Sequence, residues 1–586
     1  MNTKNVANPR SLRKHHLLFR CMTVLIMIGL ILGLQPEKAV TAQQTITFTG
    51  AEMLGRPTDT SITIKIVPAS AIQYYYQYGT ASGDYDWQTE TVTAGAGQPS
   101  TITLSGLSPN TRYYYRMQYN YNSTGWVARA EHSFWTQRAS GSSFTFTITT
   151  DSHVNIQLGN ATTWQNTLNN VAGDNPDFNI DLGDTFAIFT QVAPGEVDEA
   201  EAAYIYQLPF FNTISHSASI YVAAGNHEQT EGWHRFDTPN VADSTPAMSI
   251  NAMKKFYLNP VPDGDFYGGN SDSFSYIEGD GGKLGNYYAW EWGDALFVVI
   301  DPFWYTETRA YSGGTMDPGD GNGDTGDRWV WTLGLTQFNW LKQTLQNSNA
   351  PYKFVLAHHM VGGSQDYVRG GAVPAHLFEW GGYNLGGSTW GFTDRRPESE
   401  WGPDPVHQIF IDNGVSGFFH GHDHEYAYEV RDGIVYQSLP AASFTGSFGI
   451  YNVSDPYTEA VVSGSGYVRV TVNPTQTSVE FITSATNKNV LHSYTIEPSE
   501  APEGVLGDVN GSGGVDSTDA LIVLSADAGI NVASYCPMNC GDANGDGFVN
   551  STDALILLSF DAGLPISFNV GLPGCPASVT PPPGCP

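Results

Sequence analysis

Histidines and acidic residues recur at five points of the chain, each directly after a short run of β-branched or aromatic residues. Three histidines and an aspartate lie within five positions of the segment FFHGHDHE (418–425), and seven of the thirteen histidines beyond residue 42 lie in or beside the five motifs. Imidazoles and carboxylates together suit Zn, Mn or Fe(II). The motifs are Asp151-Ser152-His153, Gly183-Asp184, Gly225-Asn226-His227-Glu228, His358-His359 and Gly421-His422-Asp423-His424.

One such motif is typical of a turn or of a surface histidine, but five in sequence favour a common metal site. His422 and His424, two positions apart after a strand, can be turned by an irregular loop toward two neighbouring ions. Two cations about 3.5–4 Å apart would lower the pKa of a shared water, so that hydroxide would be available near neutral pH.

The elements that must position these residues alternate between short strands and longer helical segments. Strand-like runs such as FTFTITTD (144–151), ALFVVID (295–301) and KFVLAHH (353–359) end in polar turns, and Thr336–Leu345 fits a helix. This alternation predicts a layered α/β domain, in which sites form where strands end.

The order of the five motifs resembles that of the calcineurin-like metallophosphoesterases, over residues 143–496. The resemblance implies an α/β fold of four layers, with two β-sheets flanked by helices, and two divalent metal ions (Fe, Mn or Zn). It also implies that Asp184 bridges the ions and is essential for catalysis, and that His227 protonates the leaving group. The other implied ligands are Asp151, His153 and His424 for one ion, and Asn226, His358 and His422 for the second.

The implied activity is hydrolysis of phosphate monoesters or diesters. The alternative is a catalytically inert adhesion or scaffold protein that uses the same fold structurally; intact residues at all five motifs favour the enzyme. Substrate contacts are poorly encoded. Arg369, Arg395 and Arg396 are candidate phosphate-binding groups, and surface ion pairs with Asp394 or Glu398 are the alternative.

Residues 45–138 alternate β-branched and aromatic residues with turns, which predicts an all-β sandwich. The segment Leu107–Tyr113 resembles the tyrosine corner of fibronectin type III domains, including those that precede the catalytic domain of purple acid phosphatases. Those phosphatases owe their colour to a tyrosine ligand three residues after the bridging aspartate. Because Ala187 stands there in this chain, we expect no tyrosinate-to-iron absorption band.

A repeat follows a linker at residues 497–504. GDVNGSGGVDSTDALIVLSADAG (507–529) and GDANGDGFVNSTDALILLSFDAG (541–563) are identical at 17 of 23 positions. Oxygen-bearing residues occupy positions 1, 3, 5, 9 and 12 of a calcium loop in each repeat, with glycine at position 6. The predicted calcium ligands are Asp508, Asn510, Ser512, Asp516 and Asp519 in the first loop, and Asp542, Asn544, Asp546, Asn550 and Asp553 in the second.

This repeat resembles a type I dockerin over residues 505–565, which implies two bound calcium ions and a cohesin-bearing partner. In that family the pairs Ser517-Thr518 and Ser551-Thr552 would contact the cohesin, although the basic residues that often accompany them are missing. A calcium-stabilised cap without a partner is the alternative. Ser512 removes a charge, so we expect the first loop to bind calcium less tightly. The acidic run 317–327 has part of a calcium motif and is better explained as a solvated loop.

Composition limits the remaining possibilities. The chain has 586 residues and a formal net charge of −32, which disfavours binding to nucleic acid or anionic lipid. Residues 1–42 read as a secretory signal peptide with the apolar run Met22–Leu34, and an uncleaved anchor is the alternative. No later stretch is apolar enough to span a bilayer. We therefore expect a secreted or cell-surface protein.

The cysteines agree with export, because four of the five lie near the C-terminus. Cys536, Cys540, Cys575 and Cys585 favour two disulfides, with three pairings open and a zinc site as the alternative. Residues 566–586 are rich in proline and glycine and are expected to be irregular.

Overall fold

The structure is a computed structural model. It describes residues 45–154, 159–185, 192–307, 332–359, 371–373, 375, 379, 396–445, 456–499, 504–536, 538–572, 575 and 579–585. The predictions on the signal peptide, on Ala187, on Arg369 and Arg395, and on the acidic run 317–327 lie outside these residues. Within them, no helix combines the length and the apolar character needed to cross a membrane.

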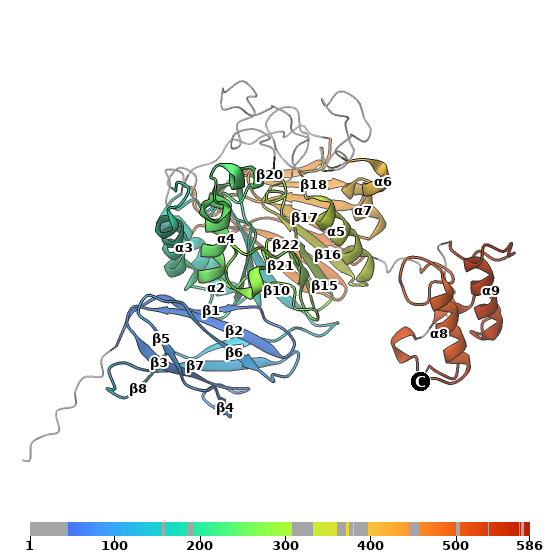
Figure 1. Cartoon of the computed structure of the whole chain (residues 1–586), viewed down its shortest axis with the longest axis horizontal. Helices are drawn as coiled ribbons and strands as arrows, with labels where there is room; N and C mark the ends of the chain where they lie inside the picture. The colour runs from blue at the N-terminus through green and yellow to red at the C-terminus, as the bar shows by residue number, and fades with distance from the viewer. Residues whose placement is uncertain are drawn as a thin grey trace, which may run out of the picture.

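The N-terminal unit is a β-sandwich (Figure 1). One sheet has the order β1-β2-β6; the other has the order β4-β3-β7-β8, with β5 paired to β3 and β9 to β7. Alternate residues of β7 are buried, as a strand with one solvated face requires. The strands are β1 (Phe48–Gly55), β2 (Ser61–Pro68), β3 (Ile72–Gly79), β4 (Trp87–Gln88), β5 (Val92–Ala94), β6 (Ser100–Ser105), β7 (Arg112–Asn120), β8 (Trp126–Ala128) and β9 (His132–Trp135).

The tyrosine corner is present in this sandwich. Tyr113 is buried, and its hydroxyl accepts a hydrogen bond from the backbone N–H of Ser108, at 2.9 Å. This bond ties the start of β7 to the preceding turn, as the resemblance to fibronectin type III domains implied.

The central unit contains two stacked sheets. The six-stranded sheet has the order β12-β11-β10-β21-β22-β23, and the eight-stranded sheet has the order β13-β14-β15-β16-β17-β19-β18-β20. The first comprises β10 (Phe144–Thr149), β11 (Phe178–Asp181), β12 (Ser219–Val222), β21 (Gly466–Asn473), β22 (Gln476–Thr483) and β23 (Val490–Ile496). The second comprises β13 (Gly268–Gly269), β14 (Tyr288–Trp292), β15 (Ala295–Val299), β16 (Tyr352–Ala357), β17 (Gly417–His420), β18 (Tyr426–Arg431), β19 (Ile434–Ser438) and β20 (Thr458–Val462).

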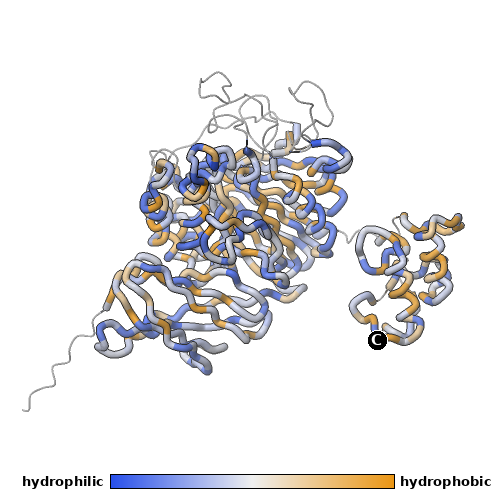
Figure 2. The backbone as a smooth tube through the Cα atoms, in the orientation of Figure 1, coloured by the Kyte–Doolittle hydropathy of each residue, from blue (hydrophilic) through white to orange (hydrophobic). Residues whose placement is uncertain are grey.

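Helices cover both outer faces, which completes the predicted four layers. The helices α2 (Ala161–Asp174), α3 (Val197–Phe211) and α4 (Thr245–Phe256) pack on the six-stranded sheet. The helices α5 (Leu335–Asn347), α6 (Glu398–Trp401) and α7 (Val406–Asp412) pack on the eight-stranded sheet. An aromatic core fills the space between the sheets, and Figure 2 shows hydrophobic segments gathered in these inner strands.

The strands that precede the motifs run in parallel. β10, β11 and β12 pair in parallel in one sheet, and β15, β16 and β17 do so in the other. Parallel pairing brings the carboxyl ends of neighbouring strands to the same edge, where ligand-binding loops collect in α/β folds.

The sandwich packs on the central unit through its first sheet. The backbone N–H of Leu54 in β1 donates to the carbonyl of Ser215. The ammonium of Lys65, in β2, donates to the carbonyls of Lys254, Lys255 and Tyr257 at the end of α4, at 2.5–2.9 Å. These carbonyls are the unsatisfied groups of a helix C-terminus, which a cation stabilises.

The C-terminal unit is a pair of similar loop-helix segments. The helices α8 (Ser517–Asp527) and α9 (Ser551–Asp561) pack against each other. Asp516 and Asn550 cap the helices, and Asp519 and Asp553 complete a capping box in each.

Two disulfides close this unit, as the sequence predicted. They join Cys536 to Cys585 and Cys540 to Cys575, so the zinc alternative for these cysteines is wrong. The described part of the tail is not free of structure: Thr580 pairs with Phe548, and its N–H donates to the carbonyl of Gly547.

Candidate metal centre

Each of the five motifs begins where a parallel strand ends. Asp151 follows β10, Asp184 follows β11 and Asn226 follows β12, while His358 follows β16 and His422 follows β17. The two sheets therefore contribute side chains from opposite sides to one place between their carboxyl edges.

The backbone at these positions is unusual. Five non-glycine residues adopt the left-handed conformation, with φ of 52° at Asp151, 44° at His153, 53° at Asp184, 71° at His422 and 61° at His424. This conformation is unfavourable for residues with a Cβ and persists only where the surroundings enforce it. Its concentration here indicates loops shaped for a site.

The glycines of the motifs permit close approach between loops. A Cβ on Gly421 would lie 2.1 Å from Thr150 Oγ1 and 2.6 Å from Asp151 Oδ2. A Cβ on Gly183 would lie 2.4 Å from the backbone nitrogen of Gly225. Larger residues would force the strand ends apart.

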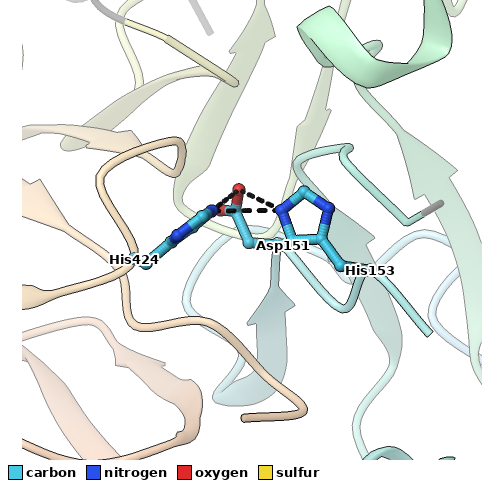
Figure 3. A group of neighbouring side chains, drawn as sticks. All are labelled: Asp151, His153 and His424. Carbon is cyan, nitrogen blue, oxygen red and sulfur yellow. Dashed lines mark hydrogen bonds and ion pairs between the residues drawn. The ribbon is translucent and has the colours of Figure 1, made fainter. Parts of the chain in front are cut away.

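Asp151, His153 and His424 form the first group (Figure 3). His424 Nε2 lies 3.1 Å from Asp151 Oδ1 and 3.1 Å from His153 Nε2, and His153 Nε2 lies 3.5 Å from the same carboxylate oxygen. The other oxygen, Oδ2, accepts hydrogen bonds from Thr150 Oγ1 and from the His422 N–H. Two imidazole nitrogens and a buried carboxylate oxygen that face one another fit a divalent cation between them.

Asp184, His358 and His422 form a second group, which Asn226 completes. Asp184 Oδ2 lies 3.2 Å from His358 Nε2, and Asn226 Oδ1 lies 3.1 Å from His358 Nε2 and 2.9 Å from His422 Nδ1. His358 Nδ1 donates to the carbonyl of Leu182 at 2.8 Å. Because Nδ1 is committed to this carbonyl, Nε2 is the ring atom that faces the two oxygens and would ligate a metal ion.

Asp184 lies between the two groups. Its Oδ2 is 3.8 Å from His153 Nε2 and 3.8 Å from His227 Nε2, besides its contact with His358. Burial alone would raise the pKa of Asp184, but the neighbouring His358 and His227 hold that pKa well below its usual value. The pKa of His358 is raised to about 10, because Asp184 outweighs the effect of burial. The centre thus has a strong attraction for positive charge.

His227 is more exposed than His424 and His153 of the first group. Its side chain is 21% exposed, against 14% for His424 and 1% for His153. Burial lowers its pKa to about 4 despite the nearby Asp184. The backbone N–H of His227 donates to Asp184 Oδ1 at 2.8 Å, which couples the position of His227 to that of the aspartate.

Glu228 is a functional residue that the sequence reasoning did not single out. Its Oε2 accepts hydrogen bonds from the N–H groups of Asp184 (2.9 Å) and Gly225 (2.6 Å), and its Oε1 accepts from the N–H (3.0 Å) and hydroxyl (3.2 Å) of Thr185. One buried carboxylate therefore joins the loops after β11 and β12. Its place in the Gly-Asn-His-Glu motif was the available signal.

Three further residues from the sequence analysis, His359, His420 and Arg396, are buried in the structure. His359 is buried, with its ring 4.0 Å from that of His422, and His420 is buried beneath the loop. Arg396 is 4% exposed, and its Nε donates to Glu379 at 3.1 Å. Glu379, which the sequence analysis did not name, thus accepts a hydrogen bond from this arginine in the interior, while Asp394 lies outside the described residues.

The predicted calcium ligands are grouped in two loops. Asp508 accepts hydrogen bonds from the N–H groups of Ser512 and Gly513, and Asp542 accepts from those of Gly545, Asp546 and Gly547. The acidic side chains at position 12, Asp519 and Asp553, are buried beneath the loops. Both loops therefore wrap around their carboxylates with the turn that glycine at position 6 allows. Ser517, Thr518, Ser551 and Thr552 begin α8 and α9 and are exposed.

Comparison with known families defines the class of the two functional units. Residues 144–426 match the family model of the calcineurin-like phosphoesterases, and residues 506–559 match that of the dockerin type I domain. The central unit is therefore a calcineurin-like phosphoesterase domain. The C-terminal unit is a type I dockerin domain, so the chain joins a phosphoesterase fold to a dockerin.

Among solved structures, the chain is similar to PhoD, with 14% identity, a TM-score of 0.52, and coverage of 77% of this chain and 90% of that one. It also matches purple acid phosphatase PPD1 from seeds of yellow lupin (Lupinus luteus), with 13% identity, a TM-score of 0.49, and coverage of 76% and 74%. No curated protein matches this chain. The similarity to PhoD shows a shared fold.

Proposed function

We propose that this protein hydrolyses phosphate monoesters or diesters at a dinuclear metal centre. The observation that carries the proposal is the convergence of carboxylates and imidazoles in overlapping groups, in each of which the ligand atoms lie within 4.8 Å of one another. Asp151, His153 and His424 would hold one ion, and Asn226, His358 and His422 the other, with Asp184 between them.

The two metal ions, when bound, would supply Lewis acidity and would lower the pKa of a bound water. The side chains of the chain itself do the remaining work. Asp184 and Asp151 compensate the positive charge and orient the histidines. His227, on the solvent side of the centre, would donate a proton or a hydrogen bond to the departing oxygen, a role that is worth about 10²–10⁴ in rate.

The dockerin supports the second part of the proposal, which concerns location. A dockerin implies a cohesin-bearing partner, to which the Ser-Thr pairs at the starts of α8 and α9 would bind. Together with the signal-like N-terminus, this favours an exported enzyme that is displayed through its C-terminal unit.

The test is to assay the purified protein with p-nitrophenyl phosphate and bis(p-nitrophenyl) phosphate and to measure bound metal. We expect hydrolysis of at least one ester with about two transition-metal ions per chain. Residues that only orient metal ligands change activity about 10–100-fold when mutated, so Asp184→Asn, which alters the proposed shared ligand, should lower kcat by more than about 10². Asp198→Asn, the same change on the exposed first turn of α3, is the control. Equal inactivity of wild type and Asp184→Asn at full metal loading would instead favour the inert scaffold.

A further inference from the structure

The outer face of the sheet β4-β3-β7-β8 carries aromatic and amide side chains. Tyr75 and Gln77 of β3 lie on the same face as Arg116 and Gln118 of β7, because Tyr75 pairs with Gln118 and Gln77 with Arg116 in the register. The residues between them point inward and are buried. The side chains on this face are partly exposed, so the face is available to a ligand.

Two aromatic rings form a corner at one end of this face. Trp126 of β8 is 41% exposed. Its ring centroid lies 4.8 Å from that of Tyr75, and the ring planes meet at 72°. A flat, partly apolar ring could stack on one of these faces while the other flanks its edge.

A row of planar polar groups continues from this corner. Gln77 Oε1 accepts hydrogen bonds from Arg116 Nε at 3.0 Å and from Gln118 Nε2 at 2.9 Å. The guanidinium of Arg116 lies over the ring of Tyr85, 4.4 Å from its centroid, and the Tyr85 hydroxyl donates to Glu131. These contacts fix the groups in place before any ligand arrives.

The row retains hydrogen-bonding capacity. Among the residues that the structure describes, neither the Nη atoms of Arg116 nor Nε2 of Gln77 donates to a protein acceptor, and Oε1 of Gln118 accepts from no protein donor. A guanidinium and two amides thus present both donors and an acceptor beside the aromatic corner.

Charge narrows the class of ligand. The chain carries a net charge of −32, which opposes a polyanion such as nucleic acid. The row itself consists of neutral amides and one cation, and it offers no apolar groove for a hydrophobic peptide. A chain of neutral sugars matches both the aromatic corner and the row of polar groups, because pyranose rings have apolar C–H faces and a periphery of hydroxyl groups.

The position of the face fits this role. The strand β1 of the other sheet contacts α3 and β12, so the first sheet faces the central unit. Figure 1 shows β3, β7 and β8 on the side of the sandwich away from that unit. A polymer could therefore lie along the outer face without entering the metal centre.

We propose that the outer face of the sheet β4-β3-β7-β8 binds a neutral polysaccharide chain, with sugar rings stacked at the Tyr75–Trp126 corner and hydroxyls bound by the row Gln77, Arg116 and Gln118. The sandwich would then hold the phosphoesterase on a polysaccharide surface, independently of its dockerin and of its catalytic activity.

Affinity electrophoresis of the full-length protein tests this inference. The native gels contain a neutral polymer, either hydroxyethylcellulose or galactomannan, or the anionic polymer polygalacturonate. We expect retardation by at least one neutral polymer and none by polygalacturonate. Trp126→Ala should raise the dissociation constant at least about tenfold, since an exposed aromatic anchor dominates such contacts. Gln118→Ala should weaken binding by a smaller factor, without removing a ring.

Trp87→Ala is the matched control. Trp87 is 45% exposed, but it stacks on Tyr78 of the opposite, inward-facing set, at 5.8 Å. This variant should bind as wild type does, and circular dichroism should show all three variants folded. Absence of retardation by both neutral polymers, unchanged binding of Trp126→Ala, or an equal loss in Trp87→Ala would each overturn the inference. None of these readouts depends on phosphoesterase activity.

Discussion

Replacing Glu228 by glutamine should disturb the metal centre although Glu228 is not a predicted ligand. The carboxylate accepts four hydrogen bonds, two at each oxygen, from Gly225 and from Asp184 and Thr185. If an amide NH₂ replaced either oxygen, it would face at least one buried backbone N–H. Both groups are donors, so no hydrogen bond could form between them. Leaving a buried donor without its acceptor costs about 1–3 kcal/mol. Two lost bonds therefore correspond to about 2–6 kcal/mol.

This cost should appear in both stability and metal binding, because the bonds join the loops that carry Asp184 and Asn226. Residues that orient metal ligands typically change metal affinity or activity about 10–100-fold. Burial and the nearby Asp184 raise the pKa of Glu228 to about 7, so the comparison belongs at pH 8. The measurements are urea unfolding, and phosphoesterase activity titrated with the native metal. We expect excess metal to restore part of the lost activity.

Glu231→Gln is the matched control for this substitution. Glu231 is also buried, three residues further on, and burial raises its pKa to about 8. Among the described residues, its side chain joins no strand-end loops, and with a pKa of about 8 it is about half protonated at pH 8, a form that a neutral amide resembles. We expect a change below about 1 kcal/mol. If Glu228→Gln matched Glu231→Gln in both stability and metal affinity, the reasoning on the loop-joining carboxylate would be refuted.

Three other predictions follow from separate features. Arg396→Met should destabilise the phosphoesterase domain by about 3–5 kcal/mol in urea unfolding, because it leaves Glu379 buried without its partner; a neutral result would contradict the buried ion pair. Burial lowers the pKa of His132 to about 4, so between pH 6.5 and 4 the unfolded chain binds a proton that the folded chain does not. The free energy of unfolding should therefore decrease as the pH is lowered from 6.5 to 4, by at most about 1.4 kcal/mol per pH unit. Calorimetry of His132→Gln should show a smaller decrease over the same range. Asp546→Ser should weaken the tighter of two calcium sites in titration calorimetry without changing ester hydrolysis, and unchanged calcium affinity would argue against that ligand.

The convergence of the candidate metal ligands could be predicted from the sequence because these residues lie at strand ends, and strand ends can be recognised locally. Asp151, Asp184 and Asn226 follow runs of β-forming residues, and parallel pairing then brings them together without further information. The layered α/β fold follows from the same alternation of strands and helices, whereas the four layers were implied by the resemblance to the calcineurin-like metallophosphoesterases.

Contacts between distant or irregular segments were not predictable in the same way. Arg396 could be assigned to several acidic residues until the fold placed Glu379 beside it. The disulfide pairing was open for the same reason, since spacing alone does not choose among three arrangements. Glu228 is visible in its motif, but its function depends on Thr185, forty-three residues earlier, in a loop whose position only the folded chain defines.

The two disulfides have a practical consequence, because both lie in the dockerin unit and its tail. Cys536–Cys585 and Cys540–Cys575 hold the strand-like segment around Thr580 against Gly547, a residue of the second calcium loop. Recombinant protein made in a reducing cytosol would therefore have an intact phosphoesterase domain and a C-terminal unit without its two disulfides. An assay of its phosphoesterase activity would not detect that the two disulfides of the C-terminal unit are missing.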